Sequence, residues 1–154
     1  MKSMKMSACR RPCRLCVLID ADNARPADIG KVLTIASGIG NVCVKKIYGG
    51  GPVLEAWKPS ALAHDLTVMH QFAFTPRKNA TDMALTIDAM DMLHEGGHSV
   101  FCLVSSDSDF TPLARRLKNS EIIVHGFGNS TAPRSLQVSC SEWHEIKTSS
   151  KQAR

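Results

Sequence analysis

Short apolar runs alternate with amphipathic stretches along the whole chain. The run "LCVLID" is continuous and apolar, as in a strand buried on both faces of a parallel sheet. The stretch "ADIGKVLTIASGIG" instead places Ile29, Val32 and Ala36 at helical spacing and ends on glycines, which commonly stop helices. The pattern predicts strands at 15–20, 41–48, 66–74, 98–106 and 121–128. It predicts helical segments at 27–40, 53–65 (interrupted or bent at Pro59), 80–97, 110–119 and 132–140.

This alternation of strands and helices predicts an α/β fold with a mostly parallel sheet and helices on both of its faces. A length of 154 residues fits one domain. We expect that domain over 15–146, between a basic flexible tail at 1–14 and a flexible tail at 147–154. No apolar run reaches the roughly 18 to 20 residues that a membrane helix needs, so we expect a cytoplasmic protein without a membrane partner.

The net charge of +5 belongs to the two ends of the chain. Residues 1–14 and 147–154 carry eight basic side chains and no acid, whereas 15–146 holds 11 Lys and Arg against 14 Asp and Glu. Basic tails can add salt-dependent affinity for phosphate backbones, but they do not identify the partner of the folded domain.

Cysteine and histidine give weaker signals. Cys9, Cys13 and Cys16 form C-x3-C-x2-C, which suggests zinc, but a fourth ligand is missing and Cys16 already belongs to the first strand. We favour reduced thiols that behave as small apolar side chains. The six histidines show no metal-like spacing, and His125 lies in an apolar strand, where a position in or near the core is expected.

Acidic side chains follow two of the predicted strands. Asp20, Asp22 and Asn23 end the first strand, and Asp107 and Asp109 follow the strand at 98–106. Ligands of such folds bind outside the carboxyl ends of the strands, and neighbouring strands would bring at least two of these carboxylates together. Like charges at close range need a cation or a proton between them. Oxygen ligands without a nearby His or Cys indicate Mg²⁺ or Mn²⁺.

Asp82 is the third candidate ligand, because it lies in the first turn of the helix at 80–97, after a candidate N-cap at Asn79. Asp88 and Asp91 point elsewhere around that helix, so we expect Asp91 to be solvated and regard Asp88 as doubtful. Asp82 could instead complement the helix dipole.

Asp109 could instead cap the helix that contains Pro112. Asp20 and Asp107 have no evident capping role. Two basic residues, Arg77 and Lys78, precede Asp82 and could hold a phosphodiester backbone or belong to a solvated loop.

Five blocks carry a family resemblance: "VLIDADNA", "KKIYG", "KNATDMALTIDAMDML", "CLVSSDSDFTPLARRL" and "GFGNSTAPRSL". In that order they resemble the NYN domain, in the LabA-like branch of the PIN-like nuclease superfamily. The similarity covers roughly 15–146. It implies a PIN-like three-layer α/β/α sandwich and a metal-dependent endonuclease, usually acting on RNA. Related proteins often carry a further RNA-binding module, which we do not expect here.

The family's acidic positions fall on Asp20, Asp82 and Asp107, with Asp109 and Asn23 as accessory groups. Asp22, which also follows the first strand, is our further accessory candidate. The resulting hypothesis is hydrolysis of single-stranded RNA with Mg²⁺ or Mn²⁺ held by the three carboxylates, Asp109 orienting water, and Arg77 and Lys78 holding the backbone. Two alternatives stay open. One is a haloacid-dehalogenase-like phosphatase that uses Asp20 as a nucleophile. The other is a catalytically silent module that binds RNA or protein, and a homodimer is also open.

Overall fold

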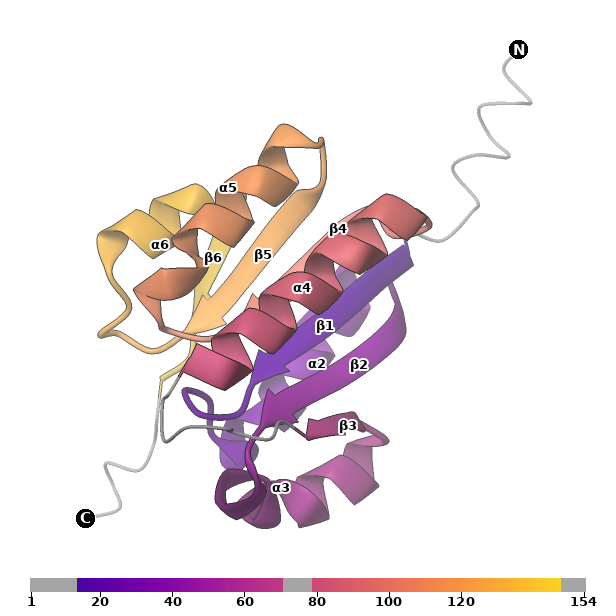
Figure 1. The fold of residues 1–154 in the computed structure, drawn as a ribbon, viewed down its shortest axis with the longest axis vertical. Coiled ribbons are helices and arrows are strands. Elements are labelled where there is room, and N and C mark those ends of the chain that lie inside the picture. The colour runs from indigo at the N-terminus through magenta and orange to yellow at the C-terminus, as the bar shows by residue number, and fades with distance from the viewer. Residues whose placement is uncertain (1–13, 71–78, 148–154) are drawn as a thin grey trace.

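A computed structural model describes residues 14–70 and 79–147, which form one six-stranded sheet with helices on both faces (Figure 1). All strand pairs are parallel. The strands are β1 (Arg14–Asp20), β2 (Asn41–Gly49), β3 (Thr67–His70), β4 (Val100–Val104), β5 (Ile123–Gly128) and β6 (Glu142–Glu145). The helices are α2 (Ile29–Ile39), α3 (Gly51–His64), α4 (Asn79–Glu95), α5 (Thr111–Asn119) and α6 (Arg134–Ser139), with 3-10 turns η1 (Pro26–Asp28) and η2 (Ser108–Phe110).

Two apolar cores lie on the two faces of the sheet. Val17 of β1 packs in one core with Val32 of α2 and Trp57 of α3. The next residue of the strand, Leu18, packs in the other core with side chains of α4, α5 and α6, because successive side chains of a strand point to opposite faces. In Figure 1, α4, α5 and α6 lie in front of the sheet and α2 lies behind it. The predicted α/β/α sandwich is therefore confirmed.

The strand order places the start of the chain at the middle of the sheet. The order is β3-β2-β1-β4-β5-β6, so the chain runs outward from β1 through β2 to β3, then returns to β4 on the other side of β1. The direction of winding thus reverses between β1 and β4, and ligands of open α/β sheets bind at such a point. The register pairs Ile19 with Val104, so the residues that follow them emerge side by side.

Several predicted boundaries differ from the observed ones. The pattern missed β6, whose sequence "EWHE" has no apolar run. The third strand covers Thr67–His70, and the predicted remainder at 71–74 lies outside the described residues. The interruption expected at Pro59 is wrong, because α3 runs through it from Gly51 to His64. Gly50 and Gly51 supply the helix start, and Pro52 lies in the first turn, where its missing N–H costs nothing.

The cysteines of the described residues are free thiols. Cys16 and Cys102 are buried in the two central strands, as expected of small apolar side chains, and burial raises the pKa of both thiols. Cys9 and Cys13 lie outside the described residues. No helix within 14–70 and 79–147 has both the length and the apolar character needed to cross a membrane.

Candidate functional site

Three carboxylates from separate segments meet at the point where the winding reverses. Asp20 ends β1, Asp107 follows β4 by three residues, and Asp82 lies in the first turn of α4. One oxygen from each carboxylate lies within 4.8 Å of the other two. The structure thus brings together the three acidic residues predicted as metal ligands.

Asp20 is fully buried and held by three donors. Its Oδ2 accepts hydrogen bonds from the Ser105 hydroxyl and the Asn23 side-chain amide, each at 2.8 Å, and its Oδ1 accepts from the Asp22 N–H at 3.2 Å. Burial raises the pKa of Asp20, and the hydrogen bonds from Asn23 and Ser105 oppose that rise because they stabilise the carboxylate. Asp20 is therefore fixed in orientation before any ligand arrives.

Ser105 joins the two strand ends, and sequence reasoning missed this role. Its hydroxyl donates to Asp20 and accepts from the Asp107 N–H at 3.0 Å. The available signal was its place directly after a buried strand that is a neighbour of β1.

Asp107, not Asp109, is the capping residue of this segment. Its Oδ1 accepts a hydrogen bond from the Asp109 N–H at 2.9 Å, which starts the turn η2 ahead of α5. The residue before α5 is Phe110, which provides no side-chain cap. The prediction that Asp109 caps this helix is therefore wrong. The prediction that Asp107 has no capping role is also wrong. One Asp107 oxygen serves the turn, and the carboxylate still reaches the cluster.

Asp82 has the most perturbed acidity of the cluster. Burial, followed by the charges of Asp107, Asp20 and Asp109, raises the pKa of Asp82 to about 7. Asp109 is exposed, and its negative charge adds to the rise in the pKa of Asp82. The residues before Asn79 lie outside the described residues, so the cap at Asn79 stays a prediction.

The remaining candidate residues lie at the edge of the cluster or away from it. Asp22 and Asn23 are exposed, and Asp22 contacts Asp20 through its backbone N–H. Asp88 accepts hydrogen bonds from the Lys46 ammonium at 2.9 Å and from the Tyr48 hydroxyl, away from the cluster. Asp91 is exposed, as predicted. Arg77 and Lys78 lie outside the described residues.

The donor set fits a hard divalent cation. Three carboxylate oxygens within reach of one another are the ligands that Mg²⁺ and Mn²⁺ prefer. Burial is the main cause that raises the pKa of Asp20 and of Asp82, and neighbouring carboxylates add to both rises; a bound cation would stabilise the ionised carboxylates.

Taken together, the parallel sheet, the helices on both faces and the acidic cluster at the reversal point define an α/β/α protein with a candidate metal centre. A family model, the NYN domain, matches residues 14–147, and the chain belongs to that family. Among solved structures, the chain is similar to a protein of unknown function from Vibrio parahaemolyticus, at 18% identity and a TM-score of 0.71. The similarity covers 88% of this chain and 93% of that one and supports the fold alone. No curated protein matches the chain.

Proposed function

We propose that the protein is a metal-dependent endoribonuclease that hydrolyses phosphodiester bonds of single-stranded RNA. The observation that carries the proposal is the convergence of Asp20, Asp82 and Asp107 within 4.8 Å. Membership of the NYN domain family, which belongs to the PIN-like nuclease superfamily, supports it. Assignment to the LabA-like branch and a cytoplasmic location are parts of the same proposal.

In this proposal Asp20, Asp82 and Asp107 hold Mg²⁺ or Mn²⁺. When bound, the cation would bind the scissile phosphate and lower the pKa of an attacking water. Asn23 and Ser105 keep the Asp20 carboxylate aimed at the cluster through their hydrogen bonds. Asp109, exposed beside Asp82, orients the water. No protein nucleophile is needed, so Asp20 acts as a ligand and not as the acceptor of a phosphoryl group.

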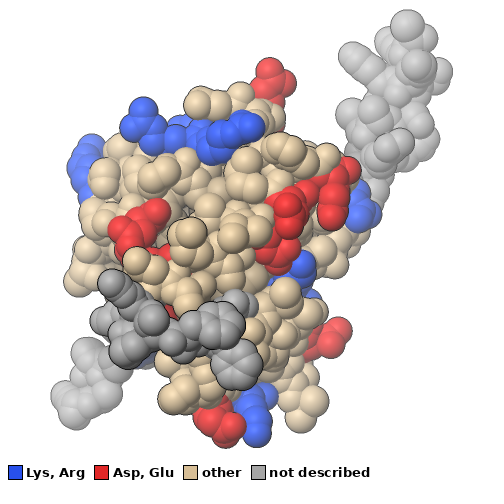
Figure 2. Space-filling view, in the orientation of Figure 1, with Lys and Arg blue, Asp and Glu red and all other residues tan. Residues whose placement is uncertain are grey.

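Basic side chains on α5 support a phosphate-bearing substrate. Figure 2 shows Lys and Arg side chains gathered over α5, and Asp and Glu side chains along α4. The exposed basic residues of α5 are Arg115, Arg116 and Lys118. Because α5 directly follows η2, an RNA strand bound at the acidic cluster would continue over this basic surface. Arg77 and Lys78, next to the start of α4, stay proposed as further backbone contacts.

The test is Mn²⁺- or Mg²⁺-dependent cleavage of a single-stranded RNA by the wild type and Asp107→Asn. Asparagine keeps an oxygen that can accept from the Asp109 N–H, so the turn should persist while the ligand charge is lost. We expect cleavage to fall at least about a hundredfold, or about 3 kcal/mol in activation free energy. Asp91→Asn, on the exposed side of α4, is the matched control and should cleave like the wild type.

The nuclease proposal fails if the wild type cleaves no RNA with any divalent ion, or if Asp107→Asn cleaves equally well. A gel-shift measurement on the same RNA then separates the remaining alternatives. Retained RNA binding without cleavage would indicate a catalytically silent module, and a phosphoryl group trapped on Asp20 would indicate the phosphatase. Light scattering of the same samples tests the homodimer.

A further inference from the structure

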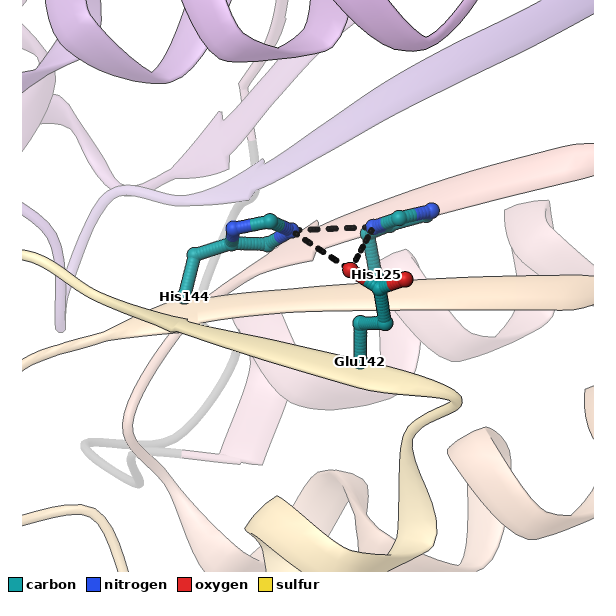
Figure 3. Close-up of side chains that lie close together, drawn as sticks. All are labelled: His125, Glu142 and His144. Carbon is teal, nitrogen blue, oxygen red and sulfur yellow. Dashed lines mark hydrogen bonds and ion pairs between the residues drawn. The ribbon is translucent and has the colours of Figure 1, made fainter.

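A second cluster of metal-ligating side chains lies on the outer strands of the sheet. His125 of β5 faces His144 of β6, with 2.9 Å between His125 Nδ1 and His144 Nε2. A Glu142 oxygen lies 3.9 Å from the first nitrogen and 4.0 Å from the second. Figure 3 shows the two imidazole rings edge to edge with the carboxylate beside the gap between them.

The sheet register creates this arrangement. β5 and β6 pair in parallel, with His125 opposite Glu142 and Phe127 opposite His144. Side chains two residues apart share a face, so the two histidines and the glutamate project to the same side as Phe127. Phe127 belongs to the core under α2 and α3, whereas Leu18, two positions before Asp20 and on the same face of β1, belongs to the core under α4. The cluster therefore lies on the α2 side of the sheet, and Asp20 points to the α4 side.

The three side chains are held to different degrees. The His125 side chain is 7% exposed, and His144 is 21% exposed and stacks on Phe127 with ring centroids 4.5 Å apart. Glu142 is 65% exposed and can turn toward the nitrogens. Two largely buried imidazoles and one exposed carboxylate form a partly preorganised chelate.

The spacing and chemistry of the donors suit zinc. Tetrahedral Zn²⁺ with bonds of about 2.0 to 2.1 Å holds its donor atoms roughly 3.3 to 3.4 Å apart. The three distances of 2.9, 3.9 and 4.0 Å lie on both sides of that value, so shifts of about half an ångström would close the site. Imidazole nitrogen favours Zn²⁺ over Mg²⁺.

We propose that His125, Glu142 and His144 bind one Zn²⁺ ion, leaving a fourth position for water, and that the ion clamps the edge strand β6 to β5. This site is separate from the proposed nuclease centre. It lies on the opposite face of the sheet, two to three strands from β1, or about 10 to 14 Å at the usual strand spacing. The proposal does not depend on the nuclease activity.

The competing explanation is a hydrogen bond between two neutral histidines without a metal, and titration with Zn²⁺ separates the two. The titration uses the full chain with Cys9→Ser and Cys13→Ser, because these substitutions remove the other candidate zinc ligands. Excess Mg²⁺ occupies the acidic cluster throughout. Isothermal titration would give stoichiometry and affinity, and Co²⁺ in place of Zn²⁺ would report tetrahedral coordination by its visible absorption. Each binding variant keeps much of the packing: Glu142→Gln is at an exposed position, and His144→Phe preserves a ring against Phe127.

We expect one Zn²⁺ per chain, an affinity at least about tenfold weaker in Glu142→Gln, and loss of binding in His144→Phe. A hundredfold excess of Zn²⁺ over its Kd should raise the Tm by about 5 to 10 °C in the parent protein and leave His144→Phe unchanged. His94→Gln, at an exposed position near the end of α4, is the histidine control and should bind like the parent. The proposal is overturned if the parent binds no Zn²⁺ or if both binding variants match the parent.

Discussion

Ser105 donates a hydrogen bond from its hydroxyl to Asp20 Oδ2 at 2.8 Å, across the two central strands of the sheet. Ser105 is 4% exposed, and its hydroxyl oxygen also accepts a hydrogen bond from the Asp107 N–H. One small side chain thus sets the orientation of two proposed metal ligands. The relationship follows from the parallel register of β1 and β4, which places the ends of both strands at the same level.

The first prediction concerns this link. Ser105→Ala should weaken Mn²⁺ binding by about ten- to a hundredfold, because a carboxylate that loses its outer hydrogen-bond partner is no longer held in one orientation. Cleavage at subsaturating Mn²⁺ should fall in parallel, with the circular dichroism spectrum unchanged. Isothermal titration with Mn²⁺ measures the affinity. Ser108→Ala, at an exposed position in the same segment, is the control. Equal Mn²⁺ affinity in Ser105→Ala and Ser108→Ala would contradict this role.

The second prediction concerns pH. Asp82 has a pKa of about 7 in the folded, metal-free protein and an ordinary value of 3.8 when unfolded. Between these values the folded state binds the extra proton, so this group stabilises the fold at low pH and its contribution is lost as the pH rises to about 7. In the presence of a chelator, the Tm difference between Asp82→Asn and the wild type should therefore shift in favour of Asp82→Asn as the pH rises from 4 to 8.

Asp91→Asn provides the comparison for this experiment, since it removes an exposed carboxyl from the same helix. Its Tm difference from the wild type should change little over the same range. Mn²⁺ should restore the wild type at pH 8 and have little effect on Asp82→Asn. A Tm difference for Asp82→Asn that does not change with pH would rule out the raised pKa.

The central part of this site could be predicted from the sequence because it depends on strand ends. Asp20 and Asp107 each follow an apolar run, and a parallel sheet brings such ends to one edge. Nothing in the local pattern distinguishes Asp107 from Asp109 as the cap, because the turn η2 inserts three residues before α5. Only the folded backbone shows which carboxylate meets which N–H.

The outer strand could not be predicted for a different reason. Glu142 and His144 lie in a four-residue edge strand with one partner, so selection for an apolar pattern is weak there. His125 and His144 are 19 residues apart in the sequence. They meet because of the register between β5 and β6, which the spacing along the chain does not reveal. The histidines therefore appeared scattered in the sequence although two of them touch in the fold.

The third prediction separates structural from functional acids on α4. Asp88 accepts from Tyr48, which is 1% exposed, and from Lys46. Asp88→Ala leaves both donors without this acceptor and should lower the free energy of unfolding by about 1 to 3 kcal/mol, measured by urea denaturation. Mn²⁺ affinity should stay at the wild-type value. Asp91→Ala is the control, and a loss of Mn²⁺ binding in Asp88→Ala would place Asp88 in the metal centre instead.

The last prediction concerns the contact that holds β6 against β5 on the α6 side. A Cβ at Gly126 would lie 2.5 Å from Cε3 of Trp143 and 2.6 Å from Sγ of Cys140, so the indole can rest on the strand only where there is no side chain. Gly126→Ala should lower the free energy of unfolding by about 1 to 3 kcal/mol through this overlap. Gly38→Ala is the matched control, because a Cβ there meets nothing within 4 Å; the substitution at this helical position should raise the free energy of unfolding by up to about 1 kcal/mol.

Replacing Trp143 by Leu in the Gly126→Ala protein should make the alanine less costly than it is beside the indole. Urea denaturation of the four proteins of this double-mutant cycle measures the coupling. Purely additive effects of the two substitutions would show that the loss arises from the backbone of β5 and not from the indole.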